Sequence, residues 1–495
     1  MTRNQGRTGK VFATLAALAL VVAACGDDDD DDAEDTTATT AAAATTAAPA
    51  TTEAAPATTA AESSAAPETT EASAAPETTE AASSVAPEDI ATDIGVDDTT
   101  IKVGMLADLS GAFAPLVTEI AEAQKVYWDN VNANGGIAGR QVELLIEDTG
   151  YDVAVTQEKY EALRNEVAIF SQSTGSPHTA AIAPSLVADD LIAIPLSWYS
   201  GWAFGELGQN AFESYTNYCI ESMNGLEWLN KNKDVQKVAL ISFPGEYGGD
   251  GAAGAKLAAE ALGLEVVYDG TGQVTPPSAD NPNPDQTAII SQIVGSGADL
   301  VWASINPTTL AGIMGGAVSQ GFTGLWSGNS PTYSFKLLGT ALAPLLDQYY
   351  IASTYIVTWG SDVPGMQDVV DAMTAARPDL PVSDVYILGW TEGEITKAIL
   401  EKAAANGDMT RAGIVAAANE VEVDFQGLAP PQTWSGDAND FVVRESYIYD
   451  VDLANYNPVT LGESGGSTGW TLLEGPYTSD TAEAFDFTEP CYVAG

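Results

Sequence analysis

Short apolar runs alternate with longer segments of helical spacing through most of this chain. Ile101–Ala107 is typical of a buried strand, and Leu116–Asn132 places apolar residues along one face of a helix. The alternation reaches Pro195, and it starts again after Gly225. Because crossover helices between short buried strands produce parallel sheets, the two sets predict an α/β fold with two doubly wound parallel-sheet lobes.

The other elements follow from the same pattern. Further strands are predicted at Gln141–Glu147, Val167–Phe170, Leu191–Pro195, Val238–Phe243, Leu264–Tyr268 and Leu300–Ser304. Helices are predicted at Ala154–Asn165, Thr179–Ala188, Gly251–Leu262, Gln286–Val294 and Thr308–Gln320. Ligands of doubly wound folds bind outside the carboxyl ends of the strands, so the loops that follow these strands are the candidate ligand loops.

The pattern before the first strand is different. Three basic residues precede an apolar or small-residue run from Val11 to Ala24, which Cys25 follows directly. This run is shorter than the roughly 20 apolar residues of a membrane span, and it predicts an export signal over residues 1–24. A cysteine in this position resembles the bacterial lipobox, where the cysteine is lipidated and holds the mature protein on the membrane outside the cytoplasm. A plain secretory signal with an incidental cysteine is the alternative.

Residues 25–98 predict a disordered tether. Asp27–Asp32 is an unbroken acidic run, and from Ala33 to about Pro87 the chain is almost only Ala, Thr, Ser, Pro and Glu. Such a segment lacks the large apolar groups whose burial would offset the entropy of ordering it. Its prolines and like charges favour an extended spacer.

Charge and composition exclude several functions. The formal net charge of −51 excludes nucleic acid as a partner, because phosphate binding needs a basic face. Beyond Cys25 only two cysteines and one histidine remain, which are too few for a structural zinc site, and no cofactor is predicted. In an oxidising compartment Cys219 and Cys491 are most economically paired in a disulfide; two free buried thiols are the alternative.

Several sequence blocks resemble one known family. Ile101–Gly111 resembles the opening strand and loop of the leucine/isoleucine/valine-binding protein family of ABC importers, the type I periplasmic binding proteins. Asn132–Gly139 is similar to that family's most recognisable block, and Ala298–Trp302 and Phe425–Leu428 resemble two more. In the second block Gly135 and its neighbours suit a left-handed turn after a helix.

The resemblance implies two lobes joined by a hinge that the chain crosses three times, near Met223, near Ile351 and near Trp434–Phe441. The first lobe is then 99–222 plus 352–432. The second lobe is 223–351 plus 433–495, which includes the C-terminal tail. Ligand stabilises the closed form of such a hinge by its higher affinity for that form.

The resemblance also implies the ligand-binding residues. They are Ser176, His178, Thr179, Ser197, Trp198, Tyr199, Tyr247, Asn306 and Asn329. Ser176, His178 and Thr179 match a short loop whose hydroxyl and helix-start amides bind a ligand carboxylate. The alternatives are that Ser176 or Thr179 only caps the helix, and that His178 is an incidental loop residue.

The aromatic residues and Asn329 define what such a site accepts. Trp198 and Tyr199 stand where the family has small and hydroxyl residues, and they suit the wall of an apolar pocket. Tyr247 matches an aromatic loop on the second lobe that closes over the ligand. Asn329 stands near the place where amino-acid-binding relatives carry a glutamate for the ligand ammonium. An amide there favours an amide or a carboxylic acid over an α-amino acid, unless Glu246 or Asp108 substitutes.

Three motifs suggest other chemistry, each with a simpler explanation. Gly249–Gly254 has the spacing of a dinucleotide-binding loop, although five residues separate it from the strand, and close helix packing explains the same glycines. Gly462–Gly466 matches a nucleophile elbow but lies in a Gly/Ser loop without a downstream histidine. Asn281–Asp285 lacks the glycine and distal glutamate of a calcium loop.

The sequence therefore predicts a lipid-anchored, extracytoplasmic solute-binding protein that delivers a small molecule to the membrane permease of an ABC importer. It is not predicted to be an enzyme. A sensory binding lipoprotein that signals to a membrane partner is the first alternative. An extracellular enzyme on the same lobes is the second, and the cleft loops lack a convergent acid, base and nucleophile for it.

Overall fold

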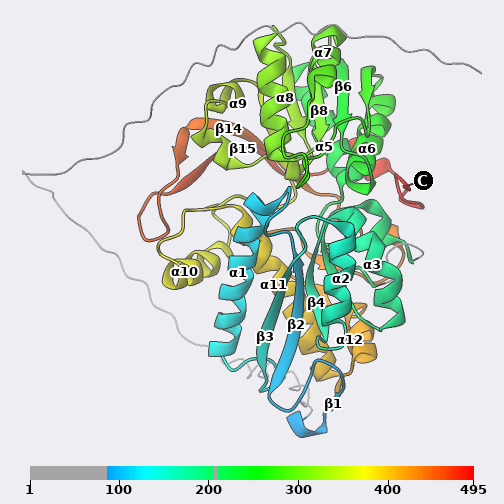
Figure 1. Ribbon diagram of the computed structural model, residues 1–495, viewed down its shortest axis with the longest axis vertical. Coiled ribbons are helices and arrows are strands. Elements are labelled where there is room, and N and C mark those ends of the chain that lie inside the picture. The colour runs from blue at the N-terminus through cyan, green and yellow to red at the C-terminus, as the bar shows by residue number, and fades with distance from the viewer. Residues whose placement is uncertain (1–85, 206–209, 495) are drawn as a thin grey trace, which may run out of the picture. The chain divides into compact units, whose positions relative to one another are not determined.

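The computed structural model describes residues 86–205 and 210–494 (Figure 1). The predicted signal peptide, Cys25 and the tether as far as residue 85 lie outside these residues. Within the described part, no helix combines the length and the apolar character that crossing a membrane requires. Residues 86–205 and 210–494 belong to one compact unit.

The first lobe is built on a parallel sheet of order β3-β2-β4-β5. Its strands are β2 (Thr100–Ala107), β3 (Gln141–Asp148), β4 (Ile169–Thr174) and β5 (Ala193–Leu196). The helices between them are α1 (Ala114–Ala133), α2 (Val153–Leu163) and α3 (Ser176–Ala188). The turn after α1 uses Gly135 and Gly136 at φ of 105° and 70°, a region that glycine adopts most easily.

The second lobe repeats this topology in the order β7-β6-β8-β9. Its strands are β6 (Lys237–Ser242), β7 (Glu265–Gly270), β8 (Leu300–Ser304) and β9 (Leu325–Gly328). Its helices are α5 (Tyr218–Lys233), α6 (Glu246–Leu262), α7 (Thr287–Ser296), α8 (Pro307–Ser319) and α9 (Ala343–Tyr349). The prediction of two doubly wound parallel-sheet lobes is confirmed, with strand ends within about two residues for most strands.

The chain then returns to the first lobe and back. β10 (Ile351–Thr354) is followed by α10 (Met366–Ala376), α11 (Val385–Ala405), β11 (Asp408–Met409), α12 (Arg411–Ala418), β12 (Glu422–Val423), β13 (Gln432–Thr433) and α13 (Ala438–Phe441). α11 packs along α1, where Gln124 Nε2 donates to Glu392 Oε2 at 2.7 Å. The long strands β14 (Ser446–Asn457) and β15 (Ser467–Tyr477) extend β10 as an antiparallel sheet, before α14 (Asp480–Ala484).

Two boundaries differ from the sequence prediction. Residues 86–98 are not part of a tether, because β1 (Ala91–Thr92) pairs with β11 and Arg140 donates to the carbonyl of Pro87 at 3.0 Å. The first crossing lies ahead of Met223, which is inside α5. Asn217 starts that helix by accepting from the amide of Ile220 at 3.0 Å.

The motifs with alternative explanations are structural. In the dinucleotide-like segment, a Cβ on Gly254 would lie 2.1 Å from the carbonyl oxygen of Cys219, so the glycine permits close packing of α5 on α6. Ser464 lies in the turn between β14 and β15, which is not the strand–turn–helix of a nucleophile elbow. No group of three acidic, histidine or cysteine side chains that suits a metal occurs among the described residues.

Candidate functional site

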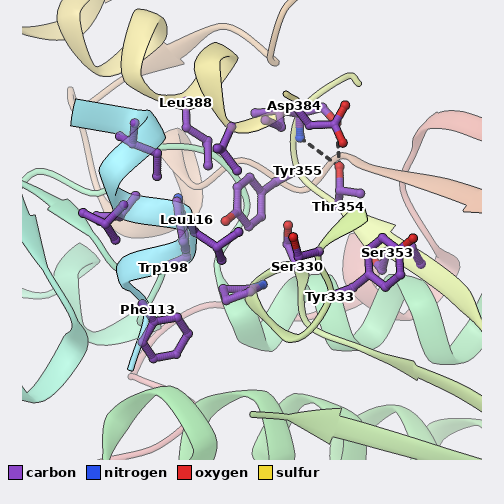
Figure 2. A pocket seen from close by; sticks show the side chains of 18 of the residues that line it. Phe113, Leu116, Trp198, Ser330, Tyr333, Ser353, Thr354, Tyr355, Asp384 and Leu388 are labelled. Atoms are coloured by element: carbon purple, nitrogen blue, oxygen red, sulfur yellow. Dashed lines mark hydrogen bonds between the residues drawn. The ribbon is translucent and has the colours of Figure 1, made fainter. Parts of the chain in front are cut away.

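A cavity of about 100 Å³ lies between the two lobes, at the carboxyl ends of their strands (Figure 2). Its lining comes from both lobes and from the segments that join them. The lining residues are Phe113, Leu116, Val117, Ile120, Tyr151, Thr174, Gly175, Ser176, Leu196, Trp198, Tyr218, Tyr247, Ser330, Pro331, Tyr333, Ser334, Phe335, Ala352, Ser353, Thr354, Tyr355, Ile356, Val357, Thr358, Asp384, Val385, Leu388 and Trp470. The surface is mostly apolar or aromatic, and none of these residues is Lys, Arg or His.

Aromatic rings form a continuous wall of this cavity. The ring centroids of Trp198 and Tyr355 are 4.3 Å apart, and those of Trp198 and Tyr218 are 5.9 Å apart. Tyr218 in turn lies 4.6 Å from Tyr247, which contacts Phe113 edge-on at 6.4 Å. Because Tyr247 belongs to α6 and Phe113 precedes α1, the wall crosses from one lobe to the other. Such contacts hold large rigid surfaces in place around a ligand.

The amino end of α3 opens into the same cavity. Gly175, at φ of 96°, begins the helix, and no side chain accepts from the first-turn amides. Neither Ser176 nor Thr179 is therefore a cap. The Ser176 hydroxyl is instead 2.6 Å from that of Ser197, and Thr179 bonds to Ser173 at 2.8 Å. Helix-start amides without a cap are suited to binding an anion.

His178 lies behind this loop and does not line the cavity. Its ring is 4.2 Å from that of Tyr151, which does line it. Neither ring nitrogen has a hydrogen-bond partner among the described residues, and burial lowers the pKa of the imidazole. His178 is therefore a neutral ring that packs against Tyr151, because a buried imidazolium would lack a partner.

The two asparagines of the second lobe have different places, and neither lines the cavity. Asn306 starts α8 with its Oδ1 and donates from Nδ2 to the carbonyl of Ala112 in the first lobe, at 3.0 Å. Asn329 is fully buried inside the second lobe, where it donates to Glu221 at 2.9 Å and accepts from Ser304 at 2.6 Å. The residue after it, Ser330, lines the cavity instead.

Tyr199 turns away from the cavity and binds the C-terminal segment around Cys491 and Tyr492, which we call the strap. Its hydroxyl donates to the carbonyl of Tyr492 at 2.6 Å. Of the two alternatives for the cysteines, the structure has the disulfide between Cys219 and Cys491, with Cα atoms 6.3 Å apart. Cys219 lies in the first turn of α5, so the strap ties this helix to the Tyr199 loop.

A buried carboxylate completes the strap contacts. Asp250, on α6, accepts from the backbone amide of Ser200 at 3.0 Å and from its hydroxyl, and that hydroxyl accepts from the amide of Cys491 at 3.0 Å. Burial raises the pKa of Asp250 to about 7, although both bonds from Ser200 oppose the shift. The second lobe thus holds the loop that carries Trp198.

On another side the lobes meet through a partly exposed ion pair, which we call the latch. Lys336 Nζ is 2.9 Å from Glu119 Oε1 of α1 and donates to the carbonyl of Pro115 at 2.5 Å. The Lys336 side chain is 37% exposed. With Asn306 and the strap, the latch makes this a closed arrangement of the lobes.

Asp384, which precedes α11, is the only acid among the lining residues. It accepts from the amide of Trp359 at 2.8 Å, from the hydroxyl of Thr468 at 2.7 Å and from the indole of Trp470 at 2.6 Å. Burial raises its pKa to about 6. Through the bonds from Thr468 and Trp470, which belong to β15, Asp384 holds this strand against α11.

Several lining residues were not anticipated from the sequence. Leu116, Val117 and Ile120 lie in a segment whose spacing predicts a helix face but gives no indication of a cavity. Tyr218, Tyr355 and Leu388 reach the site from later segments, and only the folded topology brings them there.

Comparison with known proteins decides the family. Residues 100–457 match the sequence profile of the periplasmic binding protein family. This chain belongs to that family. Members of the family act outside the cytoplasm as substrate-binding proteins and are not enzymes, so the expectation of a binding protein is confirmed. No curated protein matches the chain.

Solved structures of the family share the fold. A fatty acid ABC transporter substrate-binding protein from Thermomonospora curvata is 29% identical, covers 81% of this chain and 97% of its own, and has a TM-score of 0.71. A branched-chain amino acid ABC transporter from Thermus thermophilus with bound valine is 19% identical, covers 79% and 98%, and has a TM-score of 0.64. LivJ from Streptococcus pneumoniae, in complex with isoleucine, is 18% identical, covers 74% and 97%, and has a TM-score of 0.59.

Proposed function

We propose that this chain is a lipid-anchored substrate-binding protein of an ABC importer, and that it captures a small carboxylate or the related amide between its lobes. Cys25 would carry the anchor, and the membrane permease of the importer would receive the ligand. The observation that supports this most directly is the interlobe cavity into which the amino end of α3 opens. The ligands named for the solved neighbours, fatty acids, valine and isoleucine, share a carboxylate.

The carboxylate would lie at the first turn of α3, against the aromatic wall. Ser176 can donate its hydroxyl there, and the helix-start amides complement a negative charge. Of the residues proposed from the sequence, Ser176, Trp198 and Tyr247 line this part of the cavity. Closure would bring Tyr247 of the second lobe over a ligand that the first lobe already holds, as in other two-lobed binding proteins.

The cavity offers little to an α-ammonium group. The only acid among its described lining residues is Asp384, whose oxygens already accept from three donors, and Asn329 and Glu221 bond to each other inside the second lobe. Burying an ammonium without a partner is unfavourable by several kcal/mol. A deaminated acid therefore fits better than the corresponding amino acid.

Thermal unfolding of the purified chain with paired ligands tests this function. Leucine is compared with isocaproate, and phenylalanine with phenylpropionate and its amide. A ligand that binds the native state raises the melting temperature, and we expect the deaminated acids to raise it more. Stabilisation by the amino acids alone would contradict the assignment of the ligand class.

The anchor is tested separately. The wild-type chain should stay with the membrane fraction after salt washing, whereas Cys25→Ser should release it. Release of both forms would contradict the lipid anchor without affecting the binding site.

A further inference from the structure

Part of the cavity lining is aliphatic rather than aromatic, and we call this part the arm. Its walls are aliphatic side chains of α1, of α11 and of the segment after β10, namely Leu116, Val117, Ile120, Ile356, Val385 and Leu388. Figure 2 shows Leu116 and Leu388 on the same side of the cavity, beside the ring of Tyr355. Ile120 and Val117 are at most 2% exposed, so this part is enclosed by the first lobe.

The arm has a direction, because its α1 residues follow one helix face. Phe113, Leu116 and Ile120 are spaced three and four residues apart, which places them one above another. At roughly 1.5 Å per residue, the step from Phe113 to Ile120 spans about 10 Å along the helix. Val385 and Leu388 are spaced in the same way at the start of α11.

The arm contains no free charge. Asp384 lies at its border, where its oxygens accept from three donors, and none of the described lining residues is basic. A second charged group on a ligand would lose its hydration there without gaining a partner. Each methylene buried against these aliphatic groups should instead raise affinity about fourfold.

We propose that the substrate is a monocarboxylic acid with an extended hydrocarbon chain, and that the chain fills the arm while the carboxylate lies at α3. This rests on the proposed function, because it takes the α3 end as the carboxylate site. The inference thus assigns Leu388 and Val117 as residues that determine specificity for chain length.

Calorimetry with a series of unbranched acids tests the proposal. Butyrate, hexanoate, octanoate and decanoate are titrated into the full chain carrying Cys25→Ser, which has no acyl group of its own to compete. Affinity should rise about fourfold per methylene until the arm is full. Equal affinities for butyrate and decanoate would contradict binding of the hydrocarbon chain in the arm, but they would not contradict the proposed function. If neither these acids nor the acids and amides of the paired screen bind, the proposed function itself fails.

Two substitutions of Leu388 test whether the hydrocarbon chain of the ligand lies in the arm. Leu388→Trp should fill the space and lower decanoate affinity at least tenfold, with a much smaller effect on butyrate. Leu388→Ala should shift the preferred chain length upward. Leu473→Trp on β15, where the native leucine is 38% exposed, is the matched control and should leave the series unchanged. If both Leu388 variants change all four acids by the same factor, the chain does not lie against Leu388 and the proposal is wrong.

Discussion

The strap and the latch hold the same two lobes together in different ways. At the strap, Asp250 and Ser200 are fully buried, and a disulfide joins Cys491 to α5. At the latch, the side chains of Lys336 and Glu119 are 37% and 14% exposed to solvent. Separating buried, bonded groups leaves them unsatisfied, whereas exposed partners exchange one another for water. The comparison indicates that the lobes open at the latch and stay joined at the strap.

The largest effect should come from the strap disulfide. Cys219 and Cys491 are 272 residues apart, so their bond closes a long loop in the unfolded chain. Replacing both by serine should lower the free energy of unfolding by about 4 kcal/mol. Denaturant unfolding measures this loss, with Cys25→Ser as a control that should change nothing. An unchanged denaturant midpoint would show that the strap stabilises the folded chain no more than the latch does.

Ser200→Ala should have the next largest effect. The change removes a donor from Asp250 and leaves the amide of Cys491 without its acceptor, which should lower the free energy of unfolding by about 2 kcal/mol. Ser291→Ala on α7, an exposed serine, should change stability by less than about 0.5 kcal/mol. Equal effects of the two substitutions would show that the strap contacts contribute little.

The strap should also respond to pH. Burial raises the pKa of Asp250 to about 7 in the folded chain, above the ordinary aspartate value of the unfolded chain. The folded state therefore holds its proton to higher pH, and the stability this provides is lost as pH rises through about 7. Denaturant unfolding measured from pH 5 to 8 should show the free energy of unfolding falling with rising pH. Each buried acid with a raised pKa adds to this slope. Asp250→Asn should reduce the slope by the contribution of one carboxylate, because burial also raises the pKa of Asp384 to about 6 and that of Glu394 to about 7. An unchanged slope would contradict the assignment.

The smallest effect should come from the latch. Lys336→Ala should leave the melting temperature almost unchanged and weaken ligand binding by about two- to fivefold, because an exposed pair contributes about 0.2–1 kcal/mol. Lys102→Ala removes a pair of equal lysine exposure within the first lobe, with Glu166, and should not change affinity. The Lys336 effect should disappear at high salt. A loss of affinity that persists at high salt would contradict this interpretation of the latch.

The sheets could be predicted because their signal is local. β2 is buried along nearly its whole length, so its apolar run is visible without knowledge of its partners. Leu300–Ser304 was placed to the residue for the same reason. Helix starts were placed less well: α6 begins at Glu246 rather than at Gly251, because its first turn is rich in glycine, a residue of low helix propensity.

The site was less predictable, because it depends on which way single side chains point. Asn329 and Ser330 are neighbours, yet one lies inside the second lobe and the other lines the cavity. Trp198 and Tyr199 show the same division between cavity and strap. Tyr355 meets Trp198 only through the return of the chain to the first lobe. No local pattern in the sequence reports such a meeting.

The path of the disulfide sets an order of events during maturation. Its two sulfur atoms come from segments on either side of most of the second lobe and of the return through the first. The bond cannot form until all of the intervening polypeptide has been synthesised and exported, because only the oxidising side of the membrane favours it. Protein recovered from a reducing cytosol would therefore lack the disulfide, and ligand binding measured on it would be that of a chain whose strap is not covalently joined to α5.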